Sequence, residues 1–397
     1  MTRPLVEEVI AALSKSKNVL LYGPPGTGKT WLVSELVTYL EERMSSGGRP
    51  TLKLGNSDDS FGTSAGKEIL KDLPKELEIE WVTFHQGYSY EEFIIGKRPK
   101  PQDGGIVLEP NFGILMSIAI NVSQGDGEKG CLLIIDEINR ANASQVFGEF
   151  ITLLDPDYRA TISEAPNPRA LKIRLPGIAY KAGLSEDITM LRGGGTHNLP
   201  EDWTFPEHVY VLATMNSIDK AALPLDSALT RRFHRVEMMP NLDFLAQKLN
   251  VNLESLATKV VSIRDNGEAI DTLTAEETTV LLLDRLNILI SIDMGEDFEL
   301  GHALVWSVVA ANEDQRWLTL INAWDHTLLP QLLERYAGRE DSLRELLKVA
   351  PDSATSKAFC ERAQIGAKAS DDAPLTLKPL RLLDELTAKN IIRHLAI

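Results

Sequence analysis

Cysteine, basic charge and long apolar runs are scarce in this sequence. Its 397 residues include two cysteines, Cys131 and Cys360, so a disulfide framework and a cysteine-based zinc site are excluded and a reducing compartment is expected. No apolar stretch approaches the ~20 residues that a membrane helix needs. Residues 1–8 are polar and charged, without the apolar segment of a signal peptide. We therefore expect a soluble, cytoplasmic protein with no membrane contact.

The charge balance is acidic throughout the chain. There are 41 basic and 57 acidic side chains, which gives a net charge of −16. Residues 1–240 carry 25 basic and 32 acidic side chains, and residues 241–397 carry 16 and 25. Because a surface that grips DNA must neutralise phosphates with Lys and Arg, neither part is expected to bind nucleic acid by bulk electrostatics. A narrow basic strip or a pore loop stays compatible with this composition.

Apolar residues follow different patterns before and after Pro240. Before it, short apolar runs alternate with helical spacing, which is typical of a parallel sheet covered by helices. These patterns predict strands at 18–22, 81–84, 131–135 and 208–214, and helices at 4–13, 31–44 and 143–154. After it, helical spacing dominates, over 241–264, 274–292, 316–336, 340–349 and 378–395. The sequence therefore predicts an α/β domain over 1–240, followed by mostly helical structure.

Two stretches interrupt the alternation inside the predicted α/β domain. Residues 85–112 contain aromatics, three prolines and Gly104-Gly105, which indicates an ordered loop or a hairpin insertion. Residues 160–205 are rich in proline and glycine and predict a long insertion or flexible loop. Within it, Arg192 and the three glycines that follow form either a mobile loop facing a pore or a disordered connection.

A glycine-rich motif follows the first predicted strand. It fits G-x-x-x-x-G-K-[ST] and stands between a strand and a helix, the context that a phosphate-binding loop requires. Its glycines let backbone N–H groups wrap phosphate, and the helix N-terminus adds a favourable dipole. Lys29 is expected at the β- and γ-phosphates and the Thr30 hydroxyl at Mg²⁺. The predicted nucleotide-binding residues of this motif are Gly23, Pro24, Pro25, Gly26, Thr27, Gly28, Lys29 and Thr30.

Polar side chains follow two further apolar runs. The run over 131–135 ends in Asp136 and Glu137, and we expect Asp136 to hold Mg²⁺ and Glu137 to activate the attacking water as general base. The run over 208–214 leads to Asn216, which in this architecture orients water against the γ-phosphate, the role called sensor 1. Each residue also has a structural reading, as a solvated strand end or a turn cap.

Two adjacent arginines, Arg231 and Arg232, follow a short helical stretch near Pro240. An arginine supplied across a subunit interface neutralises charge that develops on the transferred phosphoryl group. The planar, permanently charged guanidinium suits that task. The alternative is a salt-bridged surface pair, and the sequence leaves open which of the two arginines acts from a neighbouring subunit.

The four motifs, in this order, are the layout of an AAA+ NTPase, and a second set of residues resembles the McrB family within it. Residues 81–99 resemble the family block FHxxYSYEDFIxGxRP, and residues 136–142 read Asp-Glu-Ile-Asn-Arg-Ala-Asn. Further similar segments are the MNxxD signature at 215–219, RRF at 231–233, the IGHS lid segment at 300–303 and the I-P-L-L-E-E-Y helix at 329–336. The resemblance covers residues 15–337.

The resemblance implies an AAA+ P-loop fold with a helical lid over 241–337. The helical spacing after it predicts a C-terminal helical extension over 338–397, which the resemblance does not cover. The resemblance implies a ring, a hexamer in the family, that hydrolyses GTP or ATP with Mg²⁺ between subunits. It also implies a partner nuclease of the McrC type, in a restriction or antiphage defence system. His302 is then a lid residue that faces nucleotide, although this position more often holds arginine. DNA contact is expected through the partner or through pore loops.

This sequence departs from the family pattern at Lys220-Ala221 and at Ala303, which leaves partner contacts and base preference open. The alternative function is that of a MoxR-type chaperone-like remodeller of protein complexes without DNA. A third is a nucleotide-gated scaffold that hardly hydrolyses, and the intact Glu137 argues against it. The sequence leaves the choice between ATP and GTP open.

Overall fold

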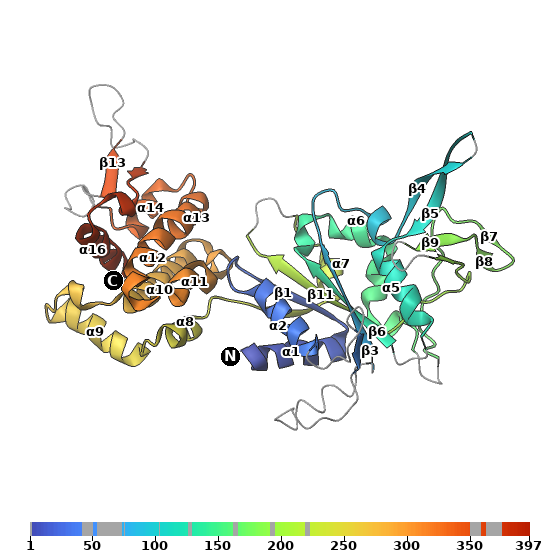
Figure 1. The fold of residues 1–397 in the computed structure, drawn as a ribbon, viewed down its shortest axis with the longest axis horizontal. Helices are drawn as coiled ribbons and strands as arrows, with labels where there is room; N and C mark the ends of the chain where they lie inside the picture. Colours follow the sequence, from blue (N-terminus) through green and yellow to red (C-terminus); the bar gives the residue numbers. More distant parts are fainter. Residues whose placement is uncertain are drawn as a thin grey trace. The chain divides into compact units, whose positions relative to one another are not determined.

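The computed structural model describes residues 2–41, 51–53, 74, 76–102, 104–125, 129–161, 166–190, 195–218, 223–349, 359–362 and 375–397. Lys220, Ala221, and Arg192 with its first two following glycines lie outside these residues. The chain divides into two compact units, one formed by Met1–Tyr22 and Lys29–Glu237, the other by Gly23–Gly28 and Met238–Ile397 (Figure 1). Each unit is described by itself.

The first unit is built on a six-stranded sheet in the order β12-β1-β11-β6-β3-β2. β12 pairs with β1, β11 with β6 and β6 with β3 in parallel, and the short β2 joins β3 antiparallel. The strands are β1 (Asn18–Gly23), β2 (Thr51–Lys53), β3 (Glu76–Thr83), β6 (Lys129–Asp136), β11 (Val209–Asn216) and β12 (His234–Glu237). The four predicted strands are all present, and β3 begins five residues before the predicted start.

The centre of the sheet is apolar on both faces. Six consecutive residues of β6 and six of β11 are buried, as expected of parallel strands covered by helices on both sides. The covering helices include α1 (Thr2–Ser16), α2 (Lys29–Glu41) and α5 (Ile114–Ser123). Burial ends at the last residue of β6 and at the last two of β11, so their polar ends share one edge of the sheet.

The insertion over 85–112 contains a short helix, α4 (Tyr90–Phe93), and a hairpin of β4 (Ile95–Gln102) and β5 (Gly105–Phe112), one of the two alternatives that the sequence leaves open. Figure 1 shows the hairpin projecting from the first unit. β9 (Ile188–Met190) adds to β5 in parallel, and β10 (Thr196–His197) adds to β9, giving a four-stranded sheet. The two insertions therefore share a sheet, which the sequence does not predict.

Of the two alternatives for 160–205, a long insertion or a flexible loop, the described part of that stretch agrees with an ordered insertion. Besides β9 and β10 it contains β7 (Tyr180–Lys181) paired with β8 (Leu184–Ser185). Several of its apolar side chains are buried in the core of the first unit, namely Ile173, Leu175, Ile188, Met190, Leu199, Trp203 and Phe205. Proline and glycine interrupt regular structure here without preventing burial.

The predicted helix over 143–154 is interrupted at Gly148. α6 (Ala143–Phe147) stops there and a 3₁₀ helix, η3 (Gly148–Leu154), continues. Gly148 has a φ of 53°, and a Cβ at this position would lie 2.9 Å from the Tyr90 ring. Left-handed backbone and a close aromatic neighbour both favour glycine, so the chain changes direction at this residue.

The second unit is helical, and apart from α10 its helices are shorter than the sequence pattern predicts. The pattern over 241–264 is two helices, because Asn250 adopts a left-handed φ of 57° between them. The pattern over 316–336 contains a π-helical turn directly before Pro330, where a missing N–H and a ring clash disturb regular α-helix. The observed helices are α8 (Leu242–Leu249), α9 (Leu253–Asp265), α10 (Ala275–Met294), α11 (Trp306–Ala310), α12 (Arg316–Ala323), α13 (Leu329–Arg335), α14 (Glu340–Leu346) and α16 (Glu385–Ala396).

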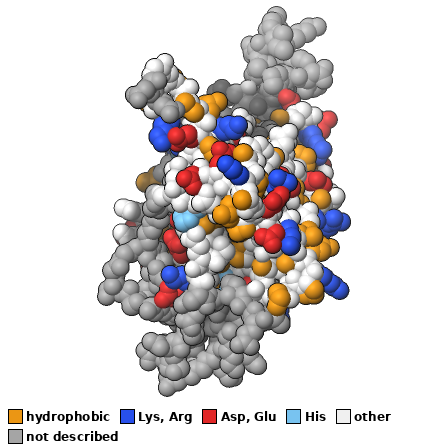
Figure 2. All heavy atoms as spheres, turned by 90° about the vertical axis from the view of Figure 1, so that its right-hand side faces the viewer, with side chains coloured by type: hydrophobic (Ala, Val, Ile, Leu, Met, Phe, Trp, Pro, Cys, Tyr) orange, Lys and Arg blue, Asp and Glu red, His pale blue; other side chains and the backbone are white. Residues whose placement is uncertain are grey.

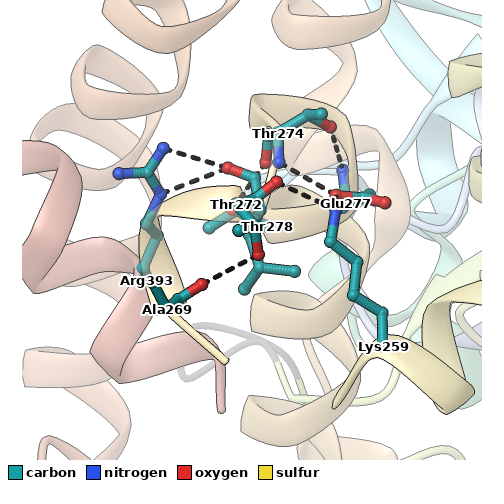
Figure 3. Close-up of polar contacts among 8 residues, drawn as sticks. Lys259, Ala269, Thr272, Thr274, Glu277, Thr278 and Arg393 are labelled. Atoms are coloured by element: carbon teal, nitrogen blue, oxygen red, sulfur yellow. Dashed lines mark hydrogen bonds and ion pairs between the residues drawn. The ribbon is translucent and has the colours of Figure 1, made fainter. Parts of the chain in front are cut away.

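One hydrophobic core holds this unit together. It contains side chains from α8 through α13 and also Leu343 of α14, Leu380, and Ile391 and Leu395 of α16. Figure 3 shows Arg393 of α16 pointing to the start of α10, where its Nε and Nη2 donate to the Leu273 carbonyl at 3.2 and 3.0 Å. The C-terminal residues thus pack with the preceding helices, and the division at 337 stays a prediction.

Candidate nucleotide-binding site

The Gly23–Thr30 loop leaves β1 and enters α2. Gly26 and Gly28 have left-handed φ values of 80° and 87°, a region that glycine adopts at no steric cost. The Thr27 hydroxyl is buried and donates to the Pro24 carbonyl at 3.0 Å, which closes the turn. The Thr30 side chain is exposed in the first turn of α2. A loop of this kind, followed by a helix N-terminus, is suited to phosphate.

Within the second unit, Gly26 packs directly against Gly301. A Cβ on Gly301 would lie 2.0 Å from the Gly26 carbonyl carbon, so no side chain fits there. The Ala303 N–H donates to the Gly26 carbonyl at 2.8 Å. Asn287 of α10 holds the preceding residue, Leu300, by two hydrogen bonds, at 2.7 Å to its N–H and 3.0 Å from its side-chain amide to its carbonyl. The loop conformation at Gly26 is therefore tied to the Leu300–Ala303 segment.

His302 is 8% exposed and lies in a short 3₁₀ helix, η7 (His302–Val305). Its Nδ1 accepts from the Asn241 N–H at 3.1 Å, and the Phe244 ring lies edge-on to it. Burial lowers the pKa of His302 below its ordinary value, so the imidazole is neutral near pH 7. These contacts show how His302 packs within the second unit, and nucleotide contact by His302 stays a prediction.

Asp136 and Glu137 stand at the carboxyl end of β6, where the sequence predicts them to act. Thr214 of β11 joins them, because its hydroxyl donates to Asp136 Oδ1 at 2.6 Å and accepts from the Glu137 N–H at 3.0 Å. The register pairs Ala213 with Ile135, so Thr214 falls opposite Asp136. Sequence reasoning passed over Thr214, although its place two residues before Asn216 was a usable signal.

The Glu137 carboxylate lies between two polar neighbours. The Asn216 side-chain amide donates to Glu137 Oε1, and the Arg140 Nε lies 3.6 Å from Glu137 Oε2. Asn139 in turn donates to the Asn216 carbonyl at 2.9 Å. Glu137 itself has a left-handed φ of 55°, which is uncommon for a residue other than glycine and recurs at functional sites. The structure thus brings together Glu137 and Asn216, two residues that the sequence pairs in function.

Lys29 is 6% exposed and lies in the electrostatic field of both carboxylates. Burial lowers the pKa of Lys29 to about 8, against the opposing influence of Glu137 and Asp136. An ammonium with so depressed a pKa gains much from a bound polyanion, which restores its preference for the charged form. The electrostatics of this edge therefore favour a phosphate ligand.

The two arginines follow α7 (Ser227–Thr230) and differ in their surroundings. Arg231 is exposed, whereas Arg232 is half-buried and its guanidinium donates to the Ala228 carbonyl. Both line an open pocket of about 580 Å³ in the first unit, together with Ser16, Asp155, Pro156, Tyr158, Phe233 and His234. The arginines stand just before β12, whose His234 pairs with Val19 at the start of β1.

Comparison with known proteins shows what this chain is similar to. The AAA domain of the dynein-related subfamily matches residues 67–233, a range that starts after the glycine-rich loop and includes the strand ends and both arginines. The chain is 27% identical over 334 residues to the type IV methyl-directed restriction enzyme EcoKMcrB subunit of Escherichia coli strain K12, covering 83% of this chain and 56% of that protein. The chain is thus similar to McrB-like AAA+ NTPases.

A second relative of the McrB-like chain is the type II restriction enzyme BsuMI component YdiS of Bacillus subtilis strain 168, 26% identical over 239 residues, or 55% of each protein. The chain spans about half the length of the curated relatives it matches. Among solved structures, the matches include Caenorhabditis elegans PCH-2 (13% identity, TM-score 0.30, 85% of this chain and 69% of that one). They also include a RuvB variant from Thermotoga maritima (14% identity, TM-score 0.32, 93% of this chain and 91% of that one). Over the described residues, no helix is long and apolar enough to cross a membrane.

Proposed function

We propose that this chain is the motor subunit of a restriction or antiphage defence complex, which hydrolyses GTP or ATP between the subunits of a ring and works with a separate nuclease. Both curated relatives are named as parts of restriction enzymes, one as a subunit and one as a component. The observation that carries the proposal is the place of the catalytic groups at opposite edges of one parallel sheet.

Asp136, Glu137 and Asn216 stand at the carboxyl edge of the sheet, whereas the arginine pair precedes β12 at the amino edge. A strand of eight residues such as β11 spans roughly 25 Å at about 3.3 Å per residue, far more than an arginine side chain reaches. An arginine of this pair therefore cannot serve the site of its own chain. It supports a site completed by the neighbouring subunit, which makes ring assembly part of catalysis.

In this proposal the chain's own residues divide the work. Lys29 and the loop glycines bind the phosphates, Glu137 takes the proton of the attacking water, and Asn216 holds Glu137 and senses the γ-phosphate. Thr214 fixes the geometry of both carboxylates through the two hydrogen bonds described above.

The residues present also fit the magnesium ion that such enzymes use. Mg²⁺ prefers oxygen ligands and is usually held by one or two carboxylates together with substrate phosphates. The Asp136 carboxylate and the exposed Thr30 hydroxyl provide oxygen donors of that kind. When bound, the ion neutralises charge on the phosphates.

Between the two arginines we propose Arg231 as the one that acts on the neighbouring subunit. Its side chain is exposed, whereas the Arg232 guanidinium is half-buried and bonded to the carbonyl of Ala228. Arg231→Ala should lower kcat by about 10³-fold or more, as loss of such an arginine does in related chemistry. Arg232→Ala should act mainly on stability. A larger kcat loss for Arg232→Ala, in a protein as stable as the wild type, would reverse the assignment.

DNA contact is proposed to come from the partner or from a few loop residues. Exposed basic side chains of the first unit pair with carboxylates, as in Lys100–Glu109 at 3.0 Å and Arg174–Glu201 at 2.9 Å. Figure 2 shows Lys and Arg interspersed with Asp and Glu over one face of the molecule. Such a mixed surface gives little net attraction to phosphate backbones.

The proposal is tested by measuring turnover of GTP and of ATP across protein concentration, with and without DNA and the product of the neighbouring gene. We expect specific activity to rise with assembly and to be stimulated by a co-purifying nuclease. Full specific activity in a proven monomer would refute the shared site. Release of a protein client without any effect of DNA or nuclease would instead support a MoxR-type remodeller. The cytoplasmic location, the hexameric ring size and the McrC type of the nuclease stay predictions.

A further inference from the structure

Asn18 is a completely buried amide at the first position of β1, and it bonds to three different segments. Its Nδ2 donates to the Leu154 carbonyl at 2.6 Å and to the Arg232 carbonyl at 3.1 Å. Its Oδ1 accepts from Nη2 of Arg159 at 2.9 Å. Both amide hydrogens and the oxygen are engaged, so the orientation of this side chain is fixed.

Arg159, which donates to the Asn18 side-chain oxygen, is itself completely buried. Its guanidinium donates to the carbonyls of Leu153 at 2.7 Å, Val209 at 2.5 Å and Leu154 at 2.8 Å, besides Asn18. Because the planar guanidinium presents its donors in a rigid fork and carries charge, these bonds set positions as well as adding stability. Arg159 therefore joins the start of β11 to the end of η3 and holds the Asn18 amide in place.

The carbonyl that accepts from Asn18 belongs to Arg232, the residue directly after Arg231. Two residues later the chain enters β12, where His234 pairs with Val19, the neighbour of Asn18. The Arg232 side chain folds back on its own turn through the Ala228 carbonyl. The backbone that carries the exposed Arg231 is thus held by interior polar groups that lie far from the carboxyl edge of the sheet.

We propose that Asn18, held by Arg159, is a positioning residue for the arginine that reaches the neighbouring subunit. The inference rests on the proposed function, since it assumes that Arg231 acts on the partner copy. Asn18 touches no reacting group and acts through the backbone at Arg232. Loss of its donor N–H should let this backbone move, and displacements of about 1 Å in a catalytic group cost about a hundredfold in rate.

The experiment uses the full chain in mixed rings. Glu137→Gln lacks the proposed base but keeps its arginines, whereas Arg231→Ala keeps its base but lacks the arginine. In a random equal mixture about a quarter of the interfaces combine an intact base with an intact arginine, so activity should return to about a quarter of wild type. Asn18→Ala and Asn18→Asp are mixed with Glu137→Gln in the same way. The aspartate keeps a partner for Arg159 but loses the donor to Arg232.

We expect each Asn18 variant alone to show kcat at least about tenfold lower, with nucleotide Kd and KM within about twofold of wild type. Mixed with Glu137→Gln, each should regain activity as Arg231→Ala does. Asn167→Ala is the matched control, because the Asn167 amide donates to the carbonyls of Asp157 and Arg159 at 2.8 Å and, among the described residues, its hydrogen bonds do not include Arg232. It should change stability without changing kcat.

Three results decide between the explanations. If Arg231→Ala regains activity in the mixture but both Asn18 variants do not, or if their nucleotide Kd rises, Asn18 acts on its own subunit and the inference is overturned while the proposed function stands. If Arg231→Ala itself does not regain activity, the shared arginine is refuted and the inference falls with it. Recovery in all three mixtures supports the positioning role.

Discussion

Two regions of the molecule fix their geometry by opposite means. At the carboxyl edge of the first unit's sheet, side-chain hydrogen bonds fix the geometry, since the Thr214 hydroxyl and the Asn216 amide hold Asp136 and Glu137. In the second unit, around Gly26 and Gly301, close backbone packing fixes the geometry, because the two main-chain segments meet where no Cβ fits. The first region should therefore be sensitive to the chemistry of a substitution, and the second to its size.

The largest effect should come from Glu137→Gln, which keeps the shape of the side chain and removes its basicity. A general base contributes about 10² to 10⁴ in rate, so kcat should fall by that factor while nucleotide Kd stays within about twofold. Steady-state hydrolysis and equilibrium nucleotide binding measure the two quantities. Glu109→Gln on the exposed hairpin is the control. Turnover at the wild-type rate would refute the role of Glu137. It would also weaken the expectation that the carboxyl edge of the sheet is sensitive to the chemistry of a substitution.

Gly301→Ala tests whether the packing of Gly26 against Gly301 is sensitive to the size of a substitution. The φ of Gly301 is −64°, which alanine adopts freely, so any effect comes from the Cβ that would fall 2.0 Å from the Gly26 carbonyl carbon. We expect the phosphate-binding loop to shift and nucleotide affinity to fall by about tenfold to a hundredfold. Ala303→Ser, at an exposed position two residues away, should change affinity little. Wild-type affinity in Gly301→Ala would show that the loop tolerates displacement.

Thr214→Val removes the hydroxyl that links the two carboxylate residues and keeps the volume. Asp136 Oδ1 and the Glu137 N–H each lose a partner, so we expect kcat to fall by about tenfold and the free energy of unfolding by about 1 to 3 kcal/mol. Denaturant unfolding and turnover are measured together. Thr258→Val is the control, since that hydroxyl bonds only its own helix at Glu254. An unchanged kcat with lowered stability would make Thr214 a structural residue alone.

The smallest effect is a pH dependence from Lys29. With a pKa of about 8 in the free protein, Lys29 loses its proton above that pH, whereas bound phosphate keeps it protonated. Nucleotide affinity should therefore fall as pH rises, by about fivefold between pH 8 and pH 9. Without nucleotide, the free energy of unfolding should rise with pH between about 8 and 10.5. In this range Lys29 holds more protons in the unfolded chain than in the folded one, so the cost of burying its ammonium group is removed as pH rises.

Lys29→Arg is the matched variant for this measurement. The guanidinium stays charged over the same pH range, so its nucleotide affinity, although lower, should be flat between pH 7 and pH 9. An equally steep decline in Lys29→Arg would assign the pH dependence to another group.

Much of the first unit could be read from local sequence pattern. The apolar runs before Gly23, Asp136 and Asn216 are strands because each is buried on both faces, and their polar ends come to one edge because the strands are parallel. The helix breaks at Gly148 and Asn250 were harder to predict from the sequence. Gly148 has a positive φ and the Tyr90 ring close by, whereas Asn250 has a left-handed φ of 57°.

The identity and order of the proposed site residues were predicted from the sequence alone, because a strand followed by a glycine-rich loop or a carboxylate is a local pattern. Only the tertiary structure decided that Thr214 faces Asp136, that Asn18 holds Arg232 and that Gly301 meets Gly26. In each case the partners are distant along the chain and meet through strand register or close backbone packing. Those depend on how the whole core folds, and no local pattern records them.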